Sequence, residues 1–198
     1  MSAHELHIGE VIASNTTQFS AVVPSLFAEP MALPIQLGSL VKTESGAVSV
    51  FALVSFIEHL PTETNRKVSP HGKTKAELRK EMPQVFELLQ TEFTALALGY
   101  ETAGKLFQST PPVPPNLHDF VFPASESDAR RFFSKPTFLR ALFQHADAAP
   151  DNLIVAMLRR YRTLFSLQEL VALGKELSYL LADDHRRLEF ILEPFLFD

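Results

Sequence analysis

The chain contains no cysteine, which excludes disulfide bonds, thiolate zinc sites, iron–sulfur clusters and cysteine nucleophiles and fits a reducing compartment. Its start has no basic residues followed by an apolar run, so no signal peptide is predicted. The longest strongly apolar run, Ala47–Ile57, is well short of the roughly 18 residues that a membrane span needs. From these absences we expect a soluble, cytoplasmic protein without a membrane association.

Positive charge is scarce at the start of the chain. Lys42 is the only Lys or Arg in the first sixty residues. Between Leu6 and Leu60 it stands against Glu10, Glu29, Glu44 and Glu58, and the net charge of the whole chain is −5. Proteins that bind a phosphate backbone usually gather positive charge on one face. The first part of the chain therefore argues against nucleic-acid binding, and its acidic surface would favour a basic partner.

Apolar side chains, by contrast, are plentiful, at 46% of the 198 residues and with 17 Phe. Between Leu6 and Leu60, short β-branched and aromatic segments alternate with turn residues, which predicts four strands. Both alternating sets of side chains in Val48–Ile57 are largely apolar, so we expect this strand to be central and covered on both faces. Four strands leave unpaired edges, and the segments 95–101 and 117–122 are the candidates to complete a barrel.

The pattern changes further along the chain. Residues 61–73 read as a loop, and a helix is predicted at about 75–93 with an interruption at Pro83. From Ser125 onward the apolar spacing is helical, and Ser125 and Ser166 each precede an acidic residue at the distance typical of a helix N-cap. We therefore predict an α+β protein, in which a small antiparallel β-barrel domain (1–122, with the helix at about 75–93 inserted) precedes an α-helical domain (123–198).

Four segments resemble a known family. They are HIGEVIASNTTQFSAVV (7–23), LGSLVKTESG (37–46), the run from RKVSPHG to LALGY (66–100) and GKELSYLLADDHRRLEFIL (174–192). Together they look like the HAS-barrel proteins of cyanobacteria, whose barrel also stands at the N-terminus of HerA-type helicases and of rotary ATP synthase subunits. In those proteins the barrel is not catalytic and helps to assemble a ring. The resemblance therefore implies a barrel that contacts other proteins, and it implies no reaction.

Motifs for catalysis or for cofactors are weak. Gly72-Lys73-Thr74 ends like a phosphate-binding loop, but Lys67 occupies the position of the first loop glycine and Pro70 removes a backbone amide. A capping box between Thr74 and Glu77 is the better interpretation, so the ATPase that usually accompanies the barrel is absent. The histidines show no spacing typical of a helical metal site, and there is no Gly-x-Ser-x-Gly. We predict no cofactor, no metal and no catalytic residue.

Two sets of residues are candidates for binding a partner. The first is basic and comprises Arg159, Arg160, Arg162, Arg186 and Arg187, which together with Arg130 and Arg131 could form a surface for phosphate groups or an acidic partner. A solvated helix face paired with Asp151, Asp183 and Asp184 is the favoured alternative. The second is an apolar anchor at the chain end, formed by Phe195, Leu196 and Phe197.

Three functions remain open. The leading hypothesis is a non-enzymatic module for protein interaction or assembly, in which the barrel docks on a partner or on itself. The second is an accessory protein that handles nucleic acid through the C-terminal arginines, and the third is an enzyme with an unrecognised site. Salt-dependent binding to DNA or RNA would favour the second, and a concave pocket with strongly perturbed carboxylates would favour the third.

Overall fold

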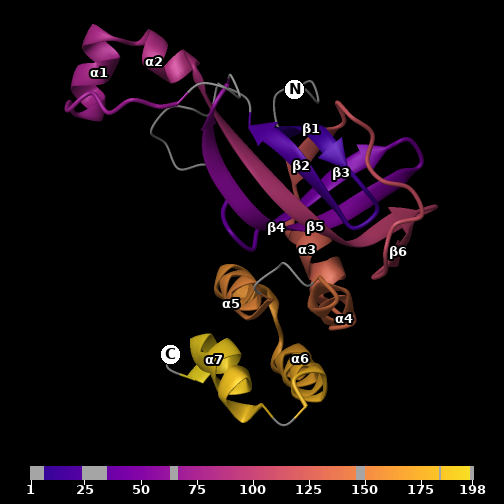
Figure 1. The fold of residues 1–198 in the computed structure, drawn as a ribbon. Helices are drawn as coiled ribbons and strands as arrows, with labels where there is room; N and C mark the ends of the chain where they lie inside the picture. Colours follow the sequence, from indigo (N-terminus) through magenta and orange to yellow (C-terminus); the bar gives the residue numbers. More distant parts are fainter. Residues whose placement is uncertain (1–6, 24–34, 63–66, 146–149, 183, 197–198) are drawn as a thin grey trace.

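The computed structural model describes residues 7–23, 35–62, 67–145, 150–182 and 184–196. It has an N-terminal β-barrel followed by helices, which confirms the predicted α+β class (Figure 1). The strands are β1 (Gly9–Ser14), β2 (Gln18–Val23), β3 (Leu40–Ser45), β4 (Val48–Pro61), β5 (Leu89–Thr102), β6 (Lys105–Phe107) and β7 (Phe120–Pro123). The helices are α1 (Lys75–Glu81), α2 (Gln84–Glu87), α3 (Glu126–Phe133), α4 (Phe138–Phe143), α5 (Pro150–Tyr161), α6 (Leu167–Leu180) and α7 (His185–Leu196), with a 3₁₀ turn at Arg162–Leu164.

Strands from beyond residue 60 close the barrel, as the sequence predicts. The strand order is β2-β1-β7-β3-β4-β5, and a further pairing of β2 with β5 joins the two edges. All pairings are antiparallel, and β6 extends the end of β5 outside the closed ring. Closure removes the free edges that would otherwise pair with another chain. The strand expected at 95–101 is longer and begins at Leu89.

The barrel interior is apolar because alternate residues of each strand point inward. Val11 of β1, Ala21 of β2 and Phe93 of β5 are register partners in one row, and all three are at most 1% exposed. The interior cluster consists of Ile8, Val11, Phe19, Ala21, Val23, Ile35, Val41, Ala52, Val54, Phe93, Ala95 and Val121. Side chains therefore fill this barrel, as in other barrels of few strands.

The helices that follow β7 pack on the outside of one end of the barrel (Figure 1). Phe51 and Leu53 of β4 are fully buried, but they belong to a second cluster that they share with the helices. The ring of Phe51 stacks on Phe132 of α3 with 5.5 Å between the ring centroids. β4 is therefore covered on both faces there, as the sequence predicts. Because barrel and helices share this core, a folding boundary near residue 122 stays a prediction, although strands give way to helices there.

A close approach of backbone to backbone fixes one contact between barrel and helices. Gly38, just before β3, has a φ of +76°, and a Cβ placed on it would lie 2.6 Å from the backbone nitrogen of Met157 in α5. A side chain at position 38 would therefore clash with the helix, and the positive φ also favours glycine. Nearby, the hydroxyl of Tyr161 accepts a hydrogen bond from the Leu40 amide at 2.8 Å.

The inserted helix is shorter than predicted, which corrects the helix at about 75–93. α1 ends at Glu81 and α2 at Glu87, and the chain then enters β5 at Leu89. Pro83 separates the two short helices because proline has no amide to donate and clashes with the preceding turn. Residues 89–93 pair with 57–61 of β4, and the Phe93 side chain fills the barrel. Tertiary packing therefore overrides local helical propensity here.

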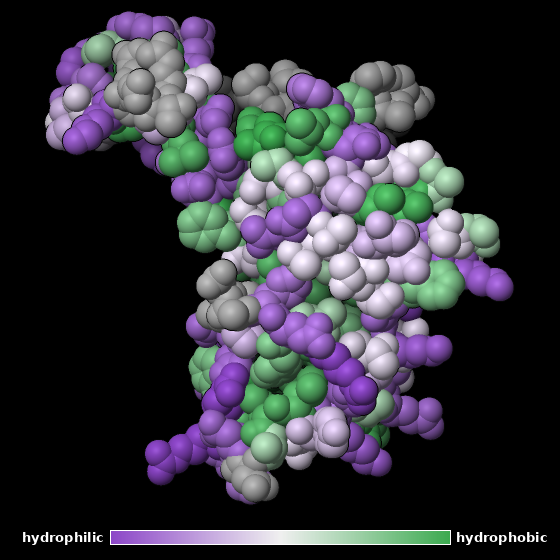
Figure 2. Space-filling model, turned by 45° about the vertical axis from the view of Figure 1, so that its right-hand side comes forward, coloured by the Kyte–Doolittle hydropathy of each residue, from purple (hydrophilic) through white to green (hydrophobic). Residues whose placement is uncertain are grey.

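Residues 67–88, hereafter the arm, project from the barrel at the end opposite the C-terminal helices (Figure 1). They include α1 and α2, neither of which contains a buried residue. In the space-filling view the arm stands off one end of the molecule and its surface is largely hydrophilic (Figure 2). Within the described ranges, no helix is long and apolar enough to cross a bilayer.

Candidate functional site

The basic residues at the end of α5 are partly occupied by contacts within the protein. Arg160 donates a hydrogen bond to Gln36 Oε1 at 3.1 Å, and its guanidinium lies 5.8 Å from the ring centroid of Tyr161. Arg162, in the 3₁₀ turn that follows, also has a partner. Arg159 is exposed and forms no ion pair with a described residue. Of these three arginines, Arg159 is therefore the one without a partner among the described residues, and Arg160 keeps its charge because its hydrogen-bond partner is a neutral amide.

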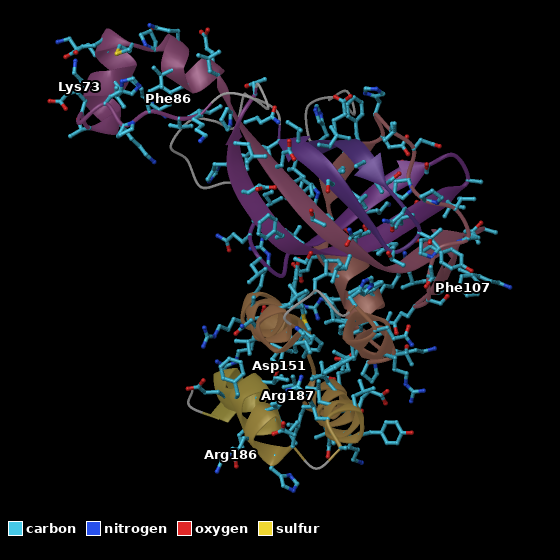
Figure 3. All side chains as sticks on the ribbon, viewed as in Figure 1. Lys73, Phe86, Phe107, Asp151, Arg186 and Arg187 are labelled. Carbon is cyan, nitrogen blue, oxygen red and sulfur yellow. The ribbon has the colours of Figure 1, made fainter. Side chains whose placement is uncertain are left out.

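Arg186 and Arg187 of α7 lie elsewhere. Arg187 donates two hydrogen bonds to Asp151, each 2.7 Å long, so the pair is bidentate (Figure 3). Such a planar pair is among the stronger side-chain contacts. Asp151 stands at the first turn of α5 and Arg159 eight residues later, which at 1.5 Å per residue is about 12 Å along the helix. The sequence-predicted arginines are therefore split between the two ends of α5, with Arg186 exposed beside the Arg187–Asp151 pair.

Arg130 and Arg131 of α3 have acidic partners as well. Arg130 contacts Glu126 at 3.1 Å, and Arg131 pairs with Glu101 of β5 and with Asp128. Arg130 also donates to the carbonyl of Leu164 at 3.4 Å, beside the 3₁₀ turn. A positively charged surface for phosphate groups needs guanidinium groups that are not already neutralised. The arrangement matches the alternative interpretation of a solvated, ion-paired helix surface.

The segment Gly72-Lys73-Thr74 forms a helix cap. The Thr74 amide donates to Glu77 Oε2 at 2.8 Å, and the Glu77 amide donates to Thr74 Oγ1 at 3.3 Å, which is the predicted capping box. Lys73 pairs with Glu81. Hydrogen bonds from the Thr74 backbone and side chain lower the pKa of Glu77 below its ordinary value. The lysine and the threonine that would hold a nucleotide thus contact Glu81 and Glu77 of α1 instead.

Titratable groups give no sign of a catalytic or metal centre in the part of the chain that the structure describes. Among the described residues, no group of three or more His, Asp or Glu side chains could hold a metal ion. Like Glu77, Glu169 has a lowered pKa because it accepts hydrogen bonds from the Ser166 backbone and side chain at the start of α6. Burial lowers the pKa of His145. Each shift therefore has a structural cause, a helix cap or burial.

Two cavities do not include Glu77, Glu169 or His145. One, of about 240 Å³, is lined by Leu40, Val41, Tyr161 and Leu164 where the barrel meets the helices. The other, of about 260 Å³, lies in the arm between Val68, Met82 and Leu89. The first is also lined by Glu126 and Arg160 and the second by Ser69 and His71, and no hydrogen bond joins any two of these four described side chains. The predicted anchor of Phe195, Leu196 and Phe197 lies outside the described residues, apart from the backbone of α7, which runs to Leu196.

A different surface, which the sequence argument did not single out, lies on the outside of the barrel. Glu10 of β1 is the register partner of Val22, Val22 of Glu92 in β5, and Glu92 of Glu58 in β4. Directly paired residues point to the same side of a sheet, and the next row, with Val11, points inward. The three carboxylates, hereafter the acidic row, therefore lie together on the outer face, with strands about 4.8 Å apart.

The acidic row has few partners of opposite charge. Glu10 Oε1 lies 2.5 Å from His118 Nδ1, and Glu92 accepts a hydrogen bond from Gln90 Nε2 at 2.6 Å. No described Lys or Arg pairs with Glu58 or Glu92. These two carboxylates face each other across the β4–β5 ladder, an arrangement of like charges that is unfavourable in isolation. A positive charge placed beside them would relieve this repulsion.

Apolar side chains border the acidic row. Phe56 of β4 is the register partner of Thr94, which contacts Ser20 through its hydroxyl at 3.1 Å, so these residues share the outer face. The Phe56 side chain is 54% exposed, and Ile12, at an irregularity in the β1–β2 pairing, is 43% exposed. An exposed aromatic ring beside unpaired charges is typical of a protein-contact surface.

No protein-family model and no curated protein sequence matches this chain.

Proposed function

We propose that the chain is a non-enzymatic module for protein interaction and assembly, of the HAS-barrel kind and without the ATPase domain, that acts in the cytoplasm. The observation that carries the proposal is the outer face of the barrel, where the acidic row borders exposed Phe56. Such a surface is suited to a basic protein partner, because the ring supplies buried area and the carboxylates supply charge complementarity.

The resemblance supports the same function. A closed barrel of six strands with a filled interior has no room for a ligand inside, so its outer surface is what it offers to other molecules. The two alternatives have less support. The arginines proposed for nucleic acid are divided between the ends of α5 and mostly paired. The shifted carboxylates, which would favour an enzyme, are helix caps.

A photo-crosslinking amino acid at position 56 tests this proposal. In cells that express the full chain, we expect irradiation to link position 56 to protein, and the yield to fall when Glu58→Lys and Glu92→Lys are added. Leu117, which is 57% exposed on the connection before β7, is the matched control position. Equal crosslinking at 56 and 117, or links from 56 to nucleic acid, would contradict the proposal.

A further inference from the structure

The arm has no core of its own. None of its residues is fully buried. α1 spans 7 residues and α2 spans 4, lengths at which an isolated helix is unstable in water. Its apolar side chains are left half-covered: Val68 is 61% exposed, and the Phe86 ring is covered on one face by Arg79 at 5.1 Å. The arm would therefore gain buried apolar area if a partner covered it.

The arm also carries a net positive charge in a protein that is negative as a whole. It contains five Lys or Arg and three Glu, a net charge of +2, whereas the whole chain carries −5. The rest of the molecule thus carries −7. Lys73 is paired with Glu81. Lys67, Lys75 and Lys80 are exposed and form no ion pair with a described residue, so they are the charges that the arm offers to a partner.

The arm and the acidic row are complementary in charge and also in apolar content. The row offers Glu58 and Glu92 beside exposed Phe56, and the arm offers three lysines beside Val68 and Phe86. Among the described residues, no Lys or Arg of the arm pairs with Glu58 or Glu92 of the same molecule, and the arm projects from the barrel (Figure 1). Each copy therefore presents an acidic surface, the acidic row, and a basic segment, the arm, whose charge is complementary to it.

We propose that the basic arm of one copy docks on the acidic row of a second copy. This inference rests on the proposed function, because it names the partner of the same barrel face. Charge complementarity selects the second copy. The cross-strand repulsion between Glu58 and Glu92 falls when lysines approach, while the arm gains buried apolar area. If the exchange is reciprocal, the two contacts form a two-fold dimer; if it is head to tail, they form a ring or a filament.

Sedimentation velocity of the purified full chain tests the inference at low and high salt. We expect association that depends on protein concentration and weakens as salt screens the charges. One variant reverses the arm (Lys67→Glu, Lys75→Glu and Lys80→Glu), and a second reverses the row (Glu58→Lys and Glu92→Lys). Either variant alone should associate at least about tenfold more weakly than the original chain, because like charges then meet at the interface.

Mixing the two variants is the decisive step. The acidic arm of the first fits the basic row of the second, and the reverse contact brings the second variant's basic arm to the first variant's acidic row. Unlike chains should therefore associate where neither variant associates alone. The row variant replaces a pair of carboxylates by a pair of ammonium groups, so like charges still face each other across the β4–β5 ladder. Thermal unfolding checks that both variants are folded.

The control variant Lys105→Glu, Lys135→Glu and Lys175→Glu makes the same charge change at exposed positions outside the arm, and it should associate as the original chain does. A chain that stays monomeric at all concentrations and salts would overturn the inference, as would a mixture that fails to associate. Salt-dependent binding of a DNA oligonucleotide that requires the arm lysines, with the protein monomeric, would also overturn it. If position 56 still crosslinks to protein in cells, the proposed function stands and the second copy is excluded.

Discussion

Helix α1 of the arm and helix α6 begin with the same kind of capping box, but they differ in how many of their side chains are buried. Thr74 and Glu77 cap α1, and Ser166 and Glu169 cap α6, in both cases through a reciprocal capping box. α6 then buries Leu173 and Leu177 in the core shared with the barrel, whereas α1 has no buried residue. The comparison shows that a cap decides where a helix begins, and that burial decides whether the helix contributes to global stability.

Phe132→Ala should give the largest effect on the stability side of this comparison. Phe132 is fully buried and stacks on Phe51 of the barrel, so its loss leaves a cavity between barrel and helices. We expect about 3–5 kcal/mol of lost unfolding free energy, measured by urea denaturation. Hydrogen exchange should report β4 and α5 opening together.

The matched control is Phe86→Ala in the arm, which removes the same side chain from a half-covered position and should cost less than about 1 kcal/mol. If the barrel keeps its protection in the Phe132 variant while the helices open, barrel and helices are separate folding units. The predicted boundary near residue 122 would then hold as a folding boundary.

Removing the arm should lower the stability of the folded chain much less than Phe132→Ala does. The Thr62 amide donates to the Leu88 carbonyl at 2.8 Å, so an Asn-Gly turn in place of residues 63–87 can close the β4–β5 hairpin. We expect the midpoint of thermal unfolding to stay within a few degrees, since the arm buries no core residue, and self-association to be lost. A large fall in the midpoint would show that the arm stabilises the barrel.

The two caps give a smaller and more specific contrast. Ser166→Ala should lower the free energy of unfolding by about 1 kcal/mol, because α6 is anchored in the shared core. Thr74→Ala removes an equivalent cap and should leave global unfolding unchanged, while amide exchange in α1 becomes faster. Equal global losses in the two variants would mean that α1 unfolds together with the core.

The smallest effect concerns acid. Hydrogen bonds from Ser166 lower the pKa of Glu169 below its ordinary 4.5, so the folded state favours the carboxylate. Its contribution is therefore present above pH 4.5 and is lost as the pH falls through the folded-state pKa. Between pH 6 and pH 3, Glu169→Gln should lose less stability than the original chain. The pKa of Glu77 is lowered by the same kind of cap. Because α1 lies outside the core, Glu77→Gln should leave the pH dependence of the global free energy of unfolding unaltered.

The caps, strands and turns were predictable because they depend on neighbouring residues. Thr74 with Glu77 and Ser166 with Glu169 are three residues apart, and the doubly apolar pattern of β4 is visible within ten residues. The helix predicted at about 75–93 was wrong at its end for the opposite reason. Whether residues 89–93 form a helix or a strand depends on pairing with 57–61, where the paired residues are 28 to 36 positions apart in the sequence.

The candidate surface could be predicted only in part. The surplus of Glu over Lys in the first sixty residues indicated an acidic barrel and a basic partner. That Glu10, Glu58 and Glu92 form one row follows from the registers of three strand pairings, which no local pattern specifies. The arginines were judged more correctly from the sequence, because an ion-paired helix face was favoured over one basic surface and Arg187 does pair with Asp151; the pairing of Arg131 with Glu101 of the barrel was not foreseen.

The sequence by itself determined the class of the protein and the start of its capped helices, because periodicity and capping are properties of short segments. The tertiary structure decided which charges stay unpaired and which apolar side chains stay exposed. Those depend on register, closure and packing between distant segments: β2 meets β5 to close the ring, and α3 and α5 bury the outer side of β4 and leave Phe56 uncovered. The proposed partner surface depends on these contacts between distant segments, so it forms only when the chain is folded.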